Sequence, residues 1–405
     1  MRVLQINAVE RVSSTGRTVT EFDAFLKDRG VESFIACSVP AADSDSFQIG
    51  TPTEKKLHGL LSRMTGKQGW FSHKGTKELL RFMDEIKPDI VLLRVLHGNF
   101  INFPMLMDYL AKKNIATVLI LHDCWFFTGK CCHYSQTGCD RFRTGCGNCP
   151  RIQQDNPSWL FDRTSCLWRA KKQMFDKIDR LGVVGVSEWI ANEGAKSPLF
   201  ANAREITGIY NGIDFAKFHD DAQGAADLRE KYGLQEKKVL LAVASKWSVH
   251  KGLSDLTALA AKMPADWQLV CVGALPQEYT VPSAMLHIAA TDSVEELASW
   301  YSAADVFLNL SKEETFGKVS AEALSCGTPV VCYNTTANPE IVGDGCGAVC
   351  SGADVQAYFD CVQEVLAGGR DSYADACTAF AHAQFDKEKN YEKLLEFLRR
   401  LAELP

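Results

Sequence analysis

Short runs rich in Val, Ile and Leu alternate with longer amphipathic stretches along the whole chain, and this alternation limits the fold more than any other feature. A parallel strand buried on both faces is a continuous apolar run, and it needs a crossover helix to reach the next strand. The pattern therefore predicts α/β domains with doubly wound sheets. The expected strands are residues 3–6, 33–37, 90–93, 117–121 and 181–186 in the first half, and 238–244, 268–272, 285–289, 306–310 and 329–333 in the second.

The 405 residues are enough for two such domains, and one segment has the marks of a boundary. Residues 209–214 contain the turn signal Asn211-Gly212, and the flanking sequence changes there from apolar to charged. A C-terminal amphipathic helix is expected to end near Leu401 and is a candidate to pack back on the first domain. The predicted parts are residues 1–207 with a Cys-rich insertion at 124–150, residues 208–382, and residues 383–405.

Composition excludes several classes of protein. The chain is 46% hydrophobic and 23% charged, which is typical of a globular protein. Its apolar runs stay below the roughly 18 residues of a membrane span, and the start of the chain resembles a short strand rather than a signal sequence. We therefore expect a cytoplasmic protein. The net charge of −6 argues against general nucleic-acid binding.

Two facing doubly wound domains predict a ligand site in an interdomain cleft, because ligands bind at the carboxyl ends of such strands. A nicotinamide-binding domain would carry Gly-x-Gly-x-x-Gly after its first strand. Residues 7–17 contain a single glycine, Gly16, which is followed by Arg17. We expect this loop to contact a phosphate or an acceptor rather than a dinucleotide.

The polar segment after the expected strand 306–310 carries the strongest functional signal. A helix is expected to begin near Lys318, because apolar residues recur there at helical spacing until Gly327 stops the pattern. Glu314 then lies in a loop and Glu322 one turn into the helix. The helix N-terminus offers backbone N–H groups to a phosphate or sugar oxygen.

At these residues the chain resembles the family 4 retaining glycosyltransferases of the GT-B fold, whose hallmark is Glu-x7-Glu with Phe-Gly after the first glutamate. The resemblance implies two Rossmann-like domains, with Glu314 contacting the transferred sugar and Glu322 holding the ribose hydroxyls of the nucleotide. The matching residues are Glu314, Phe316, Gly317, Glu322, Ala323, Gly327, Pro329 and residues 339–342. The donor site is expected to include Thr315, Phe316, Gly317, Lys318 and Val319.

The negative charge that develops on a sugar-diphosphate leaving group has to be offset by a metal or by fixed cations. The only Asp-x-Asp, at residues 43–45, is expected in a surface loop, so we predict that no cofactor is required for catalysis. Lys246 and Lys251 stand where the family has Arg and Lys five residues apart. Lys246 replaces a bidentate guanidinium with a point charge. The loop around Thr291 is expected to lie against the base.

His122 and Asp123 follow the expected strand 117–121 directly. In similar glycosyltransferases the His of this position contacts the donor sugar, so His122 is expected to orient or polarise the sugar and Asp123 to fix its ring. A lone His after a strand is often structural, which is the alternative. His97, after another strand, is a weaker candidate for the same site.

Five of the chain's 15 cysteines lie between positions 131 and 149. The spacing of Cys131, Cys139, Cys146 and Cys149 is compatible with a tetrahedral structural zinc, and Cys132 or His133 can substitute for one ligand. Disulfides or free thiols are the alternatives. The segment also looks like one found in a subgroup of these enzymes associated with colanic acid, capsule and lipopolysaccharide assembly.

The stretch from Glu54 to Arg81 carries a net charge of +5 in an otherwise acidic chain, with Trp70 and Phe71 among the basic residues. Such a segment suits an anionic membrane surface or a lipid-diphosphate acceptor. A solvated helix face explains it equally well.

Together these features predict a retaining transfer of a sugar from a UDP- or GDP-sugar to a hydroxyl of a surface glycan, such as capsule, exopolysaccharide or lipopolysaccharide. The expected partners are the nucleotide-sugar and a saccharide or lipid-linked acceptor, with contact to the inner face of the cell membrane. Two alternatives stay open: a nucleotide-sugar epimerase of the same fold, and a noncatalytic sugar-nucleotide-binding scaffold.

Overall fold

The computed structural model describes residues 1–351 and 354–403. By its internal contacts the chain forms two compact units. Unit 1 contains Met1–Ile209 and the C-terminal residues from Tyr391 on, and unit 2 contains Tyr210–Asn390. No helix among the described residues is both long and apolar enough to cross a membrane.

Unit 1 is built on a seven-stranded parallel sheet with the order β3-β2-β1-β4-β5-β6-β7. The order reverses between β1 and β4, which pair in register from Val3 opposite Ile90 to Ile6 opposite Leu93. The strands are β1 (Arg2–Val9), β2 (Glu32–Val39), β3 (Phe47–Gln48), β4 (Ile90–Leu93), β5 (Ala116–Leu121), β6 (Leu181–Gly185) and β7 (Glu205–Gly208).

Three helices of unit 1 have a side-chain cap at their N-terminus. The side chains of Thr51, Asn102 and Ser187 accept hydrogen bonds from the first helical turns of α2, α4 and α6, so orphan N–H groups there are satisfied. The helices are α1 (Ser13–Asp28), α2 (Pro52–Thr65), α3 (His73–Ile86), α4 (Phe103–Lys113), α5 (Thr164–Phe175) and α6 (Glu188–Ala195), with single turns at Ser135–Thr137, Arg141–Arg143 and Pro198–Phe200.

Unit 2 contains a six-stranded parallel sheet with the order β10-β9-β8-β11-β12-β13, which reverses between β8 and β11. Its strands are β8 (Lys238–Lys246), β9 (Trp267–Ala274), β10 (Met285–Ile288), β11 (Val306–Asn309), β12 (Val330–Tyr333) and β13 (Gly347–Cys350). Its helices are α7 (Ala222–Lys231), α8 (Leu253–Ala260), α9 (Val294–Ala303), α10 (Lys318–Ser325), α11 (Asn338–Ile341), α12 (Val355–Gly368) and α13 (Asp371–Gln384), with a single turn at Val249–Lys251.

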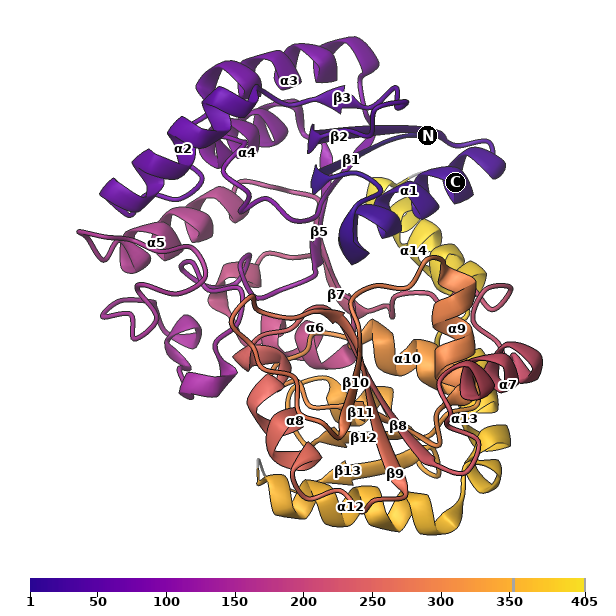
Figure 1. Cartoon of the computed structure of the whole chain (residues 1–405). Helices are drawn as coiled ribbons and strands as arrows, with labels where there is room; N and C mark the ends of the chain where they lie inside the picture. Colours follow the sequence, from indigo (N-terminus) through magenta and orange to yellow (C-terminus); the bar gives the residue numbers. More distant parts are fainter. Residues whose placement is uncertain (352–353, 404–405) are drawn as a thin grey trace. The chain divides into compact units, whose positions relative to one another are not determined.

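Apolar residues of α8 and α12 pack on one face of the second sheet. Leu256 and Val362 are fully buried there, together with Leu240 of β8 and Leu308 of β11. Helices α9, α10 and α13 pack together, away from α8 and α12 (Figure 1). Both faces of the sheet are therefore covered, which is why its strands read as continuous apolar runs.

All ten strands expected from the sequence are present in the two parallel, doubly wound sheets, so the predicted fold class is confirmed. The sequence did not predict β3, β7 and β13, each of which forms an edge of its sheet. Edge strands are covered less than central ones, and all four residues of β7 are only half-buried. Their sequences accordingly lack the apolar runs that marked the other strands.

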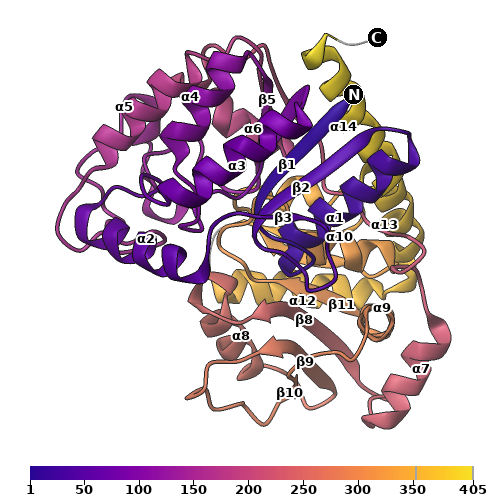
Figure 2. The same ribbon diagram turned by 90° about the horizontal axis from the view of Figure 1, so that it is seen from above.

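The last helix, α14 (Lys387–Ala402), begins in unit 2 and continues into unit 1. Figures 1 and 2 show it alongside α1, where the rings of Tyr391 and Phe22 lie 5.2 Å apart. Gly182 of β6 lets it approach the sheet, because a Cβ at that position would lie 2.7 Å from Leu401. The apolar face of α14 is thus part of the core of unit 1.

Replacing Leu398, which is fully buried on this face, tests that packing. We expect Leu398→Ala to lower the free energy of unfolding by about 2–5 kcal/mol through lost burial and a cavity. The exposed Glu396 on the same helix provides the control, and Glu396→Ala is expected to change stability by less than about 0.5 kcal/mol. The measurement is urea unfolding of both variants. Equal unfolding midpoints would contradict the packing of Leu398 in the core of unit 1.

Candidate functional site

The switch point of the second sheet brings one lysine and one glutamate together. Lys251 follows β8 and Glu314 follows β11, and these strands are neighbours on either side of the reversal in strand order. The Nζ atom of Lys251 lies 2.5 Å from Oε1 of Glu314. Ligands of doubly wound sheets bind outside the carboxyl ends of the strands at this point, so the ion pair marks the candidate site of unit 2.

The backbone of the Glu314 loop is fixed from the β12 side. The N–H of Glu314 donates to Oγ1 of Thr336 over 2.8 Å, and the N–H of Ala337 donates to the carbonyl oxygen of Glu314 over 3.2 Å. The side chain of Glu314 is 13% exposed, whereas that of Lys251 is 40% exposed. The carboxylate is therefore held in place, and the lysine retains access to solvent.

The helix α10 begins at Lys318, as predicted, and Gly317 precedes it with a left-handed φ of 79°. No side chain caps the first turn. Behind it, Nδ2 of Asn309 donates to Ser320 Oγ over 2.9 Å and to Asn338 Oδ1 over 3.2 Å. The first N–H groups of a helix lack intrahelical acceptors and attract anions, so this N-terminus provides a place for phosphate oxygens.

Glu322 lies one turn into α10, as the sequence predicted, and is almost fully buried. The hydroxyl of Tyr301 on α9 donates to its Oε2 atom over 3.0 Å. A carboxylate held in this way accepts strong hydrogen bonds from hydroxyl groups. The aromatic ring of Phe316 is buried between Tyr210 and Phe385, so this residue supports the loop from below and offers a ligand only its backbone.

The other residues predicted for this site occupy the loops at the same edge of the second sheet. Lys246 is the last residue of β8 and is exposed, and Thr291 is half-buried between β10 and α9. Thr315, Lys318 and Val319 are half-buried around the start of α10. Within this predicted set an ion pair joins Lys251 to Glu314, and a role for the others stays a prediction.

In unit 1, His122 follows β5 and contacts a buried arginine. Nη1 of Arg94 lies 3.3 Å from Nε2 of His122, and the same guanidinium donates to Oε1 of Gln5 on β1. An arginine can only donate, so Nε2 of His122 accepts and its proton lies on Nδ1. Burial, together with the charge of Arg94, lowers the pKa of His122 to about 3. His122 is therefore a neutral hydrogen-bonding group.

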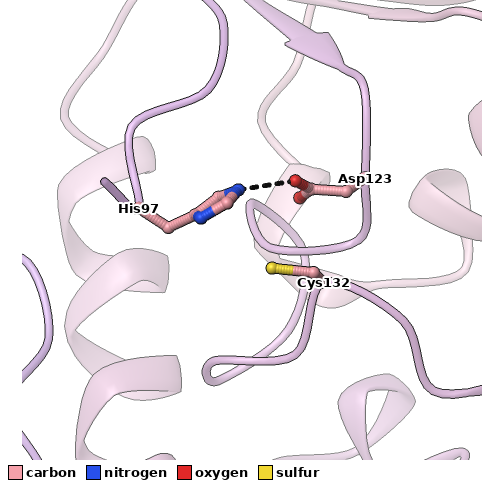
Figure 3. Close-up of side chains that lie close together, drawn as sticks. All are labelled: His97, Asp123 and Cys132. Atoms are coloured by element: carbon pink, nitrogen blue, oxygen red, sulfur yellow. Dashed lines mark hydrogen bonds and ion pairs between the residues drawn. The ribbon is translucent and has the colours of Figure 1, made fainter. Parts of the chain in front are cut away.

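Asp123 pairs with His97 from the loop after β4, with 2.7 Å between Oδ2 and Nε2 (Figure 3). Burial by itself lowers the pKa of His97, but the charge of Asp123 and the hydrogen bond to it outweigh burial and raise it. Burial likewise disfavours the charged form of Asp123, and the pairing with His97 reverses this and lowers its pKa. The weaker sequence candidate, His97, is thus the partner of Asp123.

The predicted zinc ligands lie in the loop between β5 and α5, and all fifteen cysteines of the chain are free thiols. The thiol of Cys131 hydrogen-bonds to Cys149, which raises the pKa of Cys131 and lowers that of Cys149 to about 6. Cys146 accepts the N–H of Gly129 over 3.2 Å. Within the described residues these sulfur atoms and that of Cys139 do not form a group within 4.8 Å of one another, and the structural zinc stays a prediction.

Gly16 and Arg17 lie in the first turns of α1. A Cβ on Gly16 would lie 3.2 Å from the backbone of Glu10 and Arg11, so a small residue there permits the tight passage from β1 into the helix. Arg17 is exposed. The Asp-x-Asp at 43–45 lies outside the helices and strands, and both its aspartates are exposed.

Three supporting residues were not found by sequence reasoning: Arg94, Tyr301 and Asn309. Arg94 follows the apolar strand β4 directly, and a charged residue in that place is a usable signal of a site at the strand end. Asn309 ends β11 in the same way. The sequence does not indicate a role for Tyr301, because a tyrosine on the apolar face of a helix is expected to be a core residue.

Two units with parallel, doubly wound sheets are the architecture of the GT-B class of glycosyltransferase folds, which solved structures of similar fold share. A family model described as "Glycosyl transferases group 1" matches residues 237–368. Residues 237–368, which lie in unit 2, thus match a glycosyltransferase family, and this match confirms the resemblance to glycosyltransferases found in the sequence.

Known relatives agree with this assignment. The chain is 29% identical over 209 residues to a D-inositol 3-phosphate glycosyltransferase of Mycolicibacterium smegmatis, covering 48% of this chain and 47% of that one. It therefore spans about half the length of that relative. It is 27% identical over 289 residues to the putative colanic acid biosynthesis glycosyl transferase WcaC of Escherichia coli, covering 69% and 68%. The structure of Alr3699/HepE from Anabaena in complex with UDP-glucose shares the fold, with a TM-score of 0.65, 16% identity and coverage of 99% and 100%.

The position of Lys251 depends on the glycine that follows it. Gly252 has a φ of 77°, and a Cβ there would lie 2.3 Å from the carbonyl oxygen of Leu310. Gly233 has a similar φ of 67° but nothing within 4 Å of its Cβ position. A substitution at Gly233 therefore measures the cost of the left-handed backbone without a steric clash.

We expect Gly233→Ala to cost about 1–2 kcal/mol of stability for the left-handed backbone alone. Gly252→Ala is expected to cost about 1–3 kcal/mol more, because the methyl group clashes with Leu310. Denaturant titration of both variants measures the difference. Equal losses of stability in the two variants would show that the loop moves to accommodate the methyl group and that Gly252 does not determine the position of Lys251.

Proposed function

We propose that the protein is a retaining glycosyltransferase that moves a hexose-type residue from a UDP- or GDP-sugar to a hydroxyl of a surface-glycan acceptor. The observation that carries this proposal is the Lys251–Glu314 pair, which lies at the switch point of unit 2 in the segment that precedes α10. The complex of Alr3699/HepE with UDP-glucose supports the donor class. The likeness to WcaC, named for colanic acid biosynthesis, supports the acceptor class.

In this mechanism the donor diphosphate lies at the N-terminus of α10. The backbone N–H groups and Lys251 offset the negative charge that develops as the sugar leaves, and a metal ion is not needed for that purpose. Glu314 accepts hydrogen bonds from the sugar hydroxyls, and Glu322 accepts them from the ribose. A departing phosphate oxygen takes the proton of the acceptor hydroxyl on the same face of the sugar, which retains the configuration.

His122 contributes as a donor of a hydrogen bond in this proposal. Arg94 contacts Nε2, so the atom through which the ring donates is Nδ1. With a pKa near 3 it does not act as a base at neutral pH. It therefore orients the sugar rather than deprotonating the acceptor.

The donor site is tested by matched substitutions that remove one carboxylate charge each. Glu314→Gln is expected to lower the rate of sugar transfer at least about 100-fold, as for a lost transition-state contact, while the chain still binds nucleotide. Glu322→Gln is expected to weaken nucleotide affinity by about 10–100-fold, the value of a hydrogen bond to a charged group. The exposed Glu364 on α12 gives the control Glu364→Gln, which should change neither.

The measurement is a panel of UDP-, GDP- and ADP-sugars, scored by thermal stabilisation and by release of free nucleotide. Stabilisation by none of them would refute the donor site. Conversion of a nucleotide-sugar to its epimer without nucleotide release would identify an epimerase. Normal biological activity of Glu314→Gln would indicate a noncatalytic scaffold.

We further propose that unit 1 contacts the inner face of a membrane through α2 and the loop 159–161. Leu57, Leu60 and Met64 lie three and four residues apart on one side of α2 and are 54%, 43% and 42% exposed. The loop adds Trp159, Leu160 and Phe161, which are 52%, 67% and 48% exposed. The N–H of Trp159 donates to the carbonyl oxygen of Arg63, so the loop adjoins the end of α2.

Basic side chains border this apolar surface, among them the exposed Lys56, Arg63 and Lys67. Apolar residues bordered by lysine and arginine are the pattern of proteins that lie in the interface of anionic membranes. Trp70 and Phe71, which the sequence placed among these basic residues, are half-buried.

Liposome co-sedimentation tests this surface. The double substitution Leu160→Ser and Phe161→Ser is expected to reduce binding to every vesicle, because it removes insertion. Lys56→Glu with Arg63→Glu should abolish the preference for anionic over neutral lipid. The control Lys112→Glu with Lys231→Glu makes the same charge change at exposed lysines on α4 and α7. Equal losses in the control would attribute binding to net charge alone.

A further inference from the structure

Three side chains of unit 1 lie close together and are of the kinds that bind metal ions. The proposed transfer reaction requires no metal there. His97 comes from the loop after β4, Asp123 from the end of β5, and Cys132 from the Cys-rich segment. Their ligand atoms all lie within 4.8 Å of one another. Figure 3 shows the sulfur of Cys132 next to the hydrogen-bonded pair of His97 and Asp123.

We propose that His97, Asp123 and Cys132 form a binding site for one divalent transition-metal ion, of which zinc fits best. An imidazole, a carboxylate and a thiolate are the three kinds of zinc ligand in proteins, with bonds of about 2.0–2.3 Å. Such bonds place tetrahedral ligand atoms roughly 3.3–3.8 Å apart. The three ligand atoms lie within 4.8 Å of one another, and the 2.7 Å contact between His97 and Asp123 has to open to reach this geometry.

Outer hydrogen bonds hold each ligand. Oδ1 of Asp123 accepts the N–H of Trp125 over 2.8 Å, which leaves Oδ2 toward the site. The sulfur of Cys132 accepts from Nδ2 of Asn156 over 3.6 Å. Gln68 bridges the loops, because its Nε2 donates to the carbonyl oxygen of His97 and its Oε1 accepts the indole N–H of Trp125. Partners of this kind orient metal ligands in proteins.

The charges of the ligands offset that of the ion. A carboxylate and a thiolate together carry two negative charges, which match one Zn²⁺ ion in this half-buried place. Binding displaces the thiol proton of Cys132 to solvent and requires the neutral His97 ring to carry its proton on Nδ1, so that Nε2 can bind the ion. Lys171, which donates to the carbonyl oxygens of Trp125 and Thr128, is the cation that faces Asp123 and Cys132.

Three protein ligands leave the fourth position of a tetrahedral ion open for water or a substrate oxygen. That arrangement differs from the four-thiolate zinc predicted from Cys131, Cys139, Cys146 and Cys149, which would be closed. The two sites use different residues and are separable by experiment.

The test uses the full chain, stripped of metal by a chelator and titrated with Co²⁺. We expect a sulfur-to-cobalt charge-transfer band that is lost in Cys132→Ser and retained in the double variant Cys139→Ser, Cys149→Ser. Cys166→Ser removes an exposed thiol on α5 and is the matched control that keeps the band. Asn156→Ala is expected to weaken Co²⁺ affinity about 10–100-fold while leaving the ligand set intact.

Far-UV circular dichroism of the metal-free variants separates loss of a ligand from loss of the fold, and Asn156→Ala and His97→Gln provide independent readings if Cys132→Ser misfolds. His97→Gln is expected to shift or abolish the band. A wild-type chain without a charge-transfer band, or a band that survives in both Cys132→Ser and His97→Gln, overturns the proposal. So does a band that disappears in the Cys139, Cys149 variant.

Discussion

Parallel strands have to be linked by crossovers that return to the same end of the sheet, and this constraint determines where functional groups can gather. Each reversal of strand order leaves one place where two adjacent loops diverge to opposite faces. In unit 2 that place lies between β8 and β11, and the pair formed by Lys251 and Glu314 is found there. In unit 1 it lies between β1 and β4, where Gln5 and the guanidinium of Arg94 meet.

The two units hold their charges differently. In unit 2 the lysine at the switch point stays accessible while its glutamate is nearly covered, so the pair can open when a ligand supplies other partners. In unit 1, Arg94 is buried and is satisfied by an amide and an imidazole rather than by a carboxylate. Burial, together with the charge kept in this way, maintains the neutral state of its neighbour, His122.

Much of this arrangement was predictable from the sequence. The central strands and the start of α10 were predictable, because buried parallel strands and helix N-termini have local sequence patterns. Glu314 and Glu322 lie in the loop and in the helix that the pattern predicted. Contacts between distant loops were not. The 2.7 Å contact of His97 with Asp123 and the approach of Cys132 depend on the register of β4 and β5 and on the path of a long loop, for which no local pattern exists. The exposed residues Trp159 to Phe161 were missed because an apolar tripeptide in a loop has no periodicity.

The helix α14 has a consequence for the order in which the chain can fold. Unit 1 is synthesised first, yet Tyr391, Leu395 and Leu398 complete its core and are added only after all of unit 2 has been made. While unit 2 is being synthesised, the apolar surface around Phe22 and Gly182 in unit 1 is therefore not yet covered by α14. The packing of unit 1 is therefore completed only after unit 2 has been synthesised, so the folding of the first unit depends on the synthesis of the second.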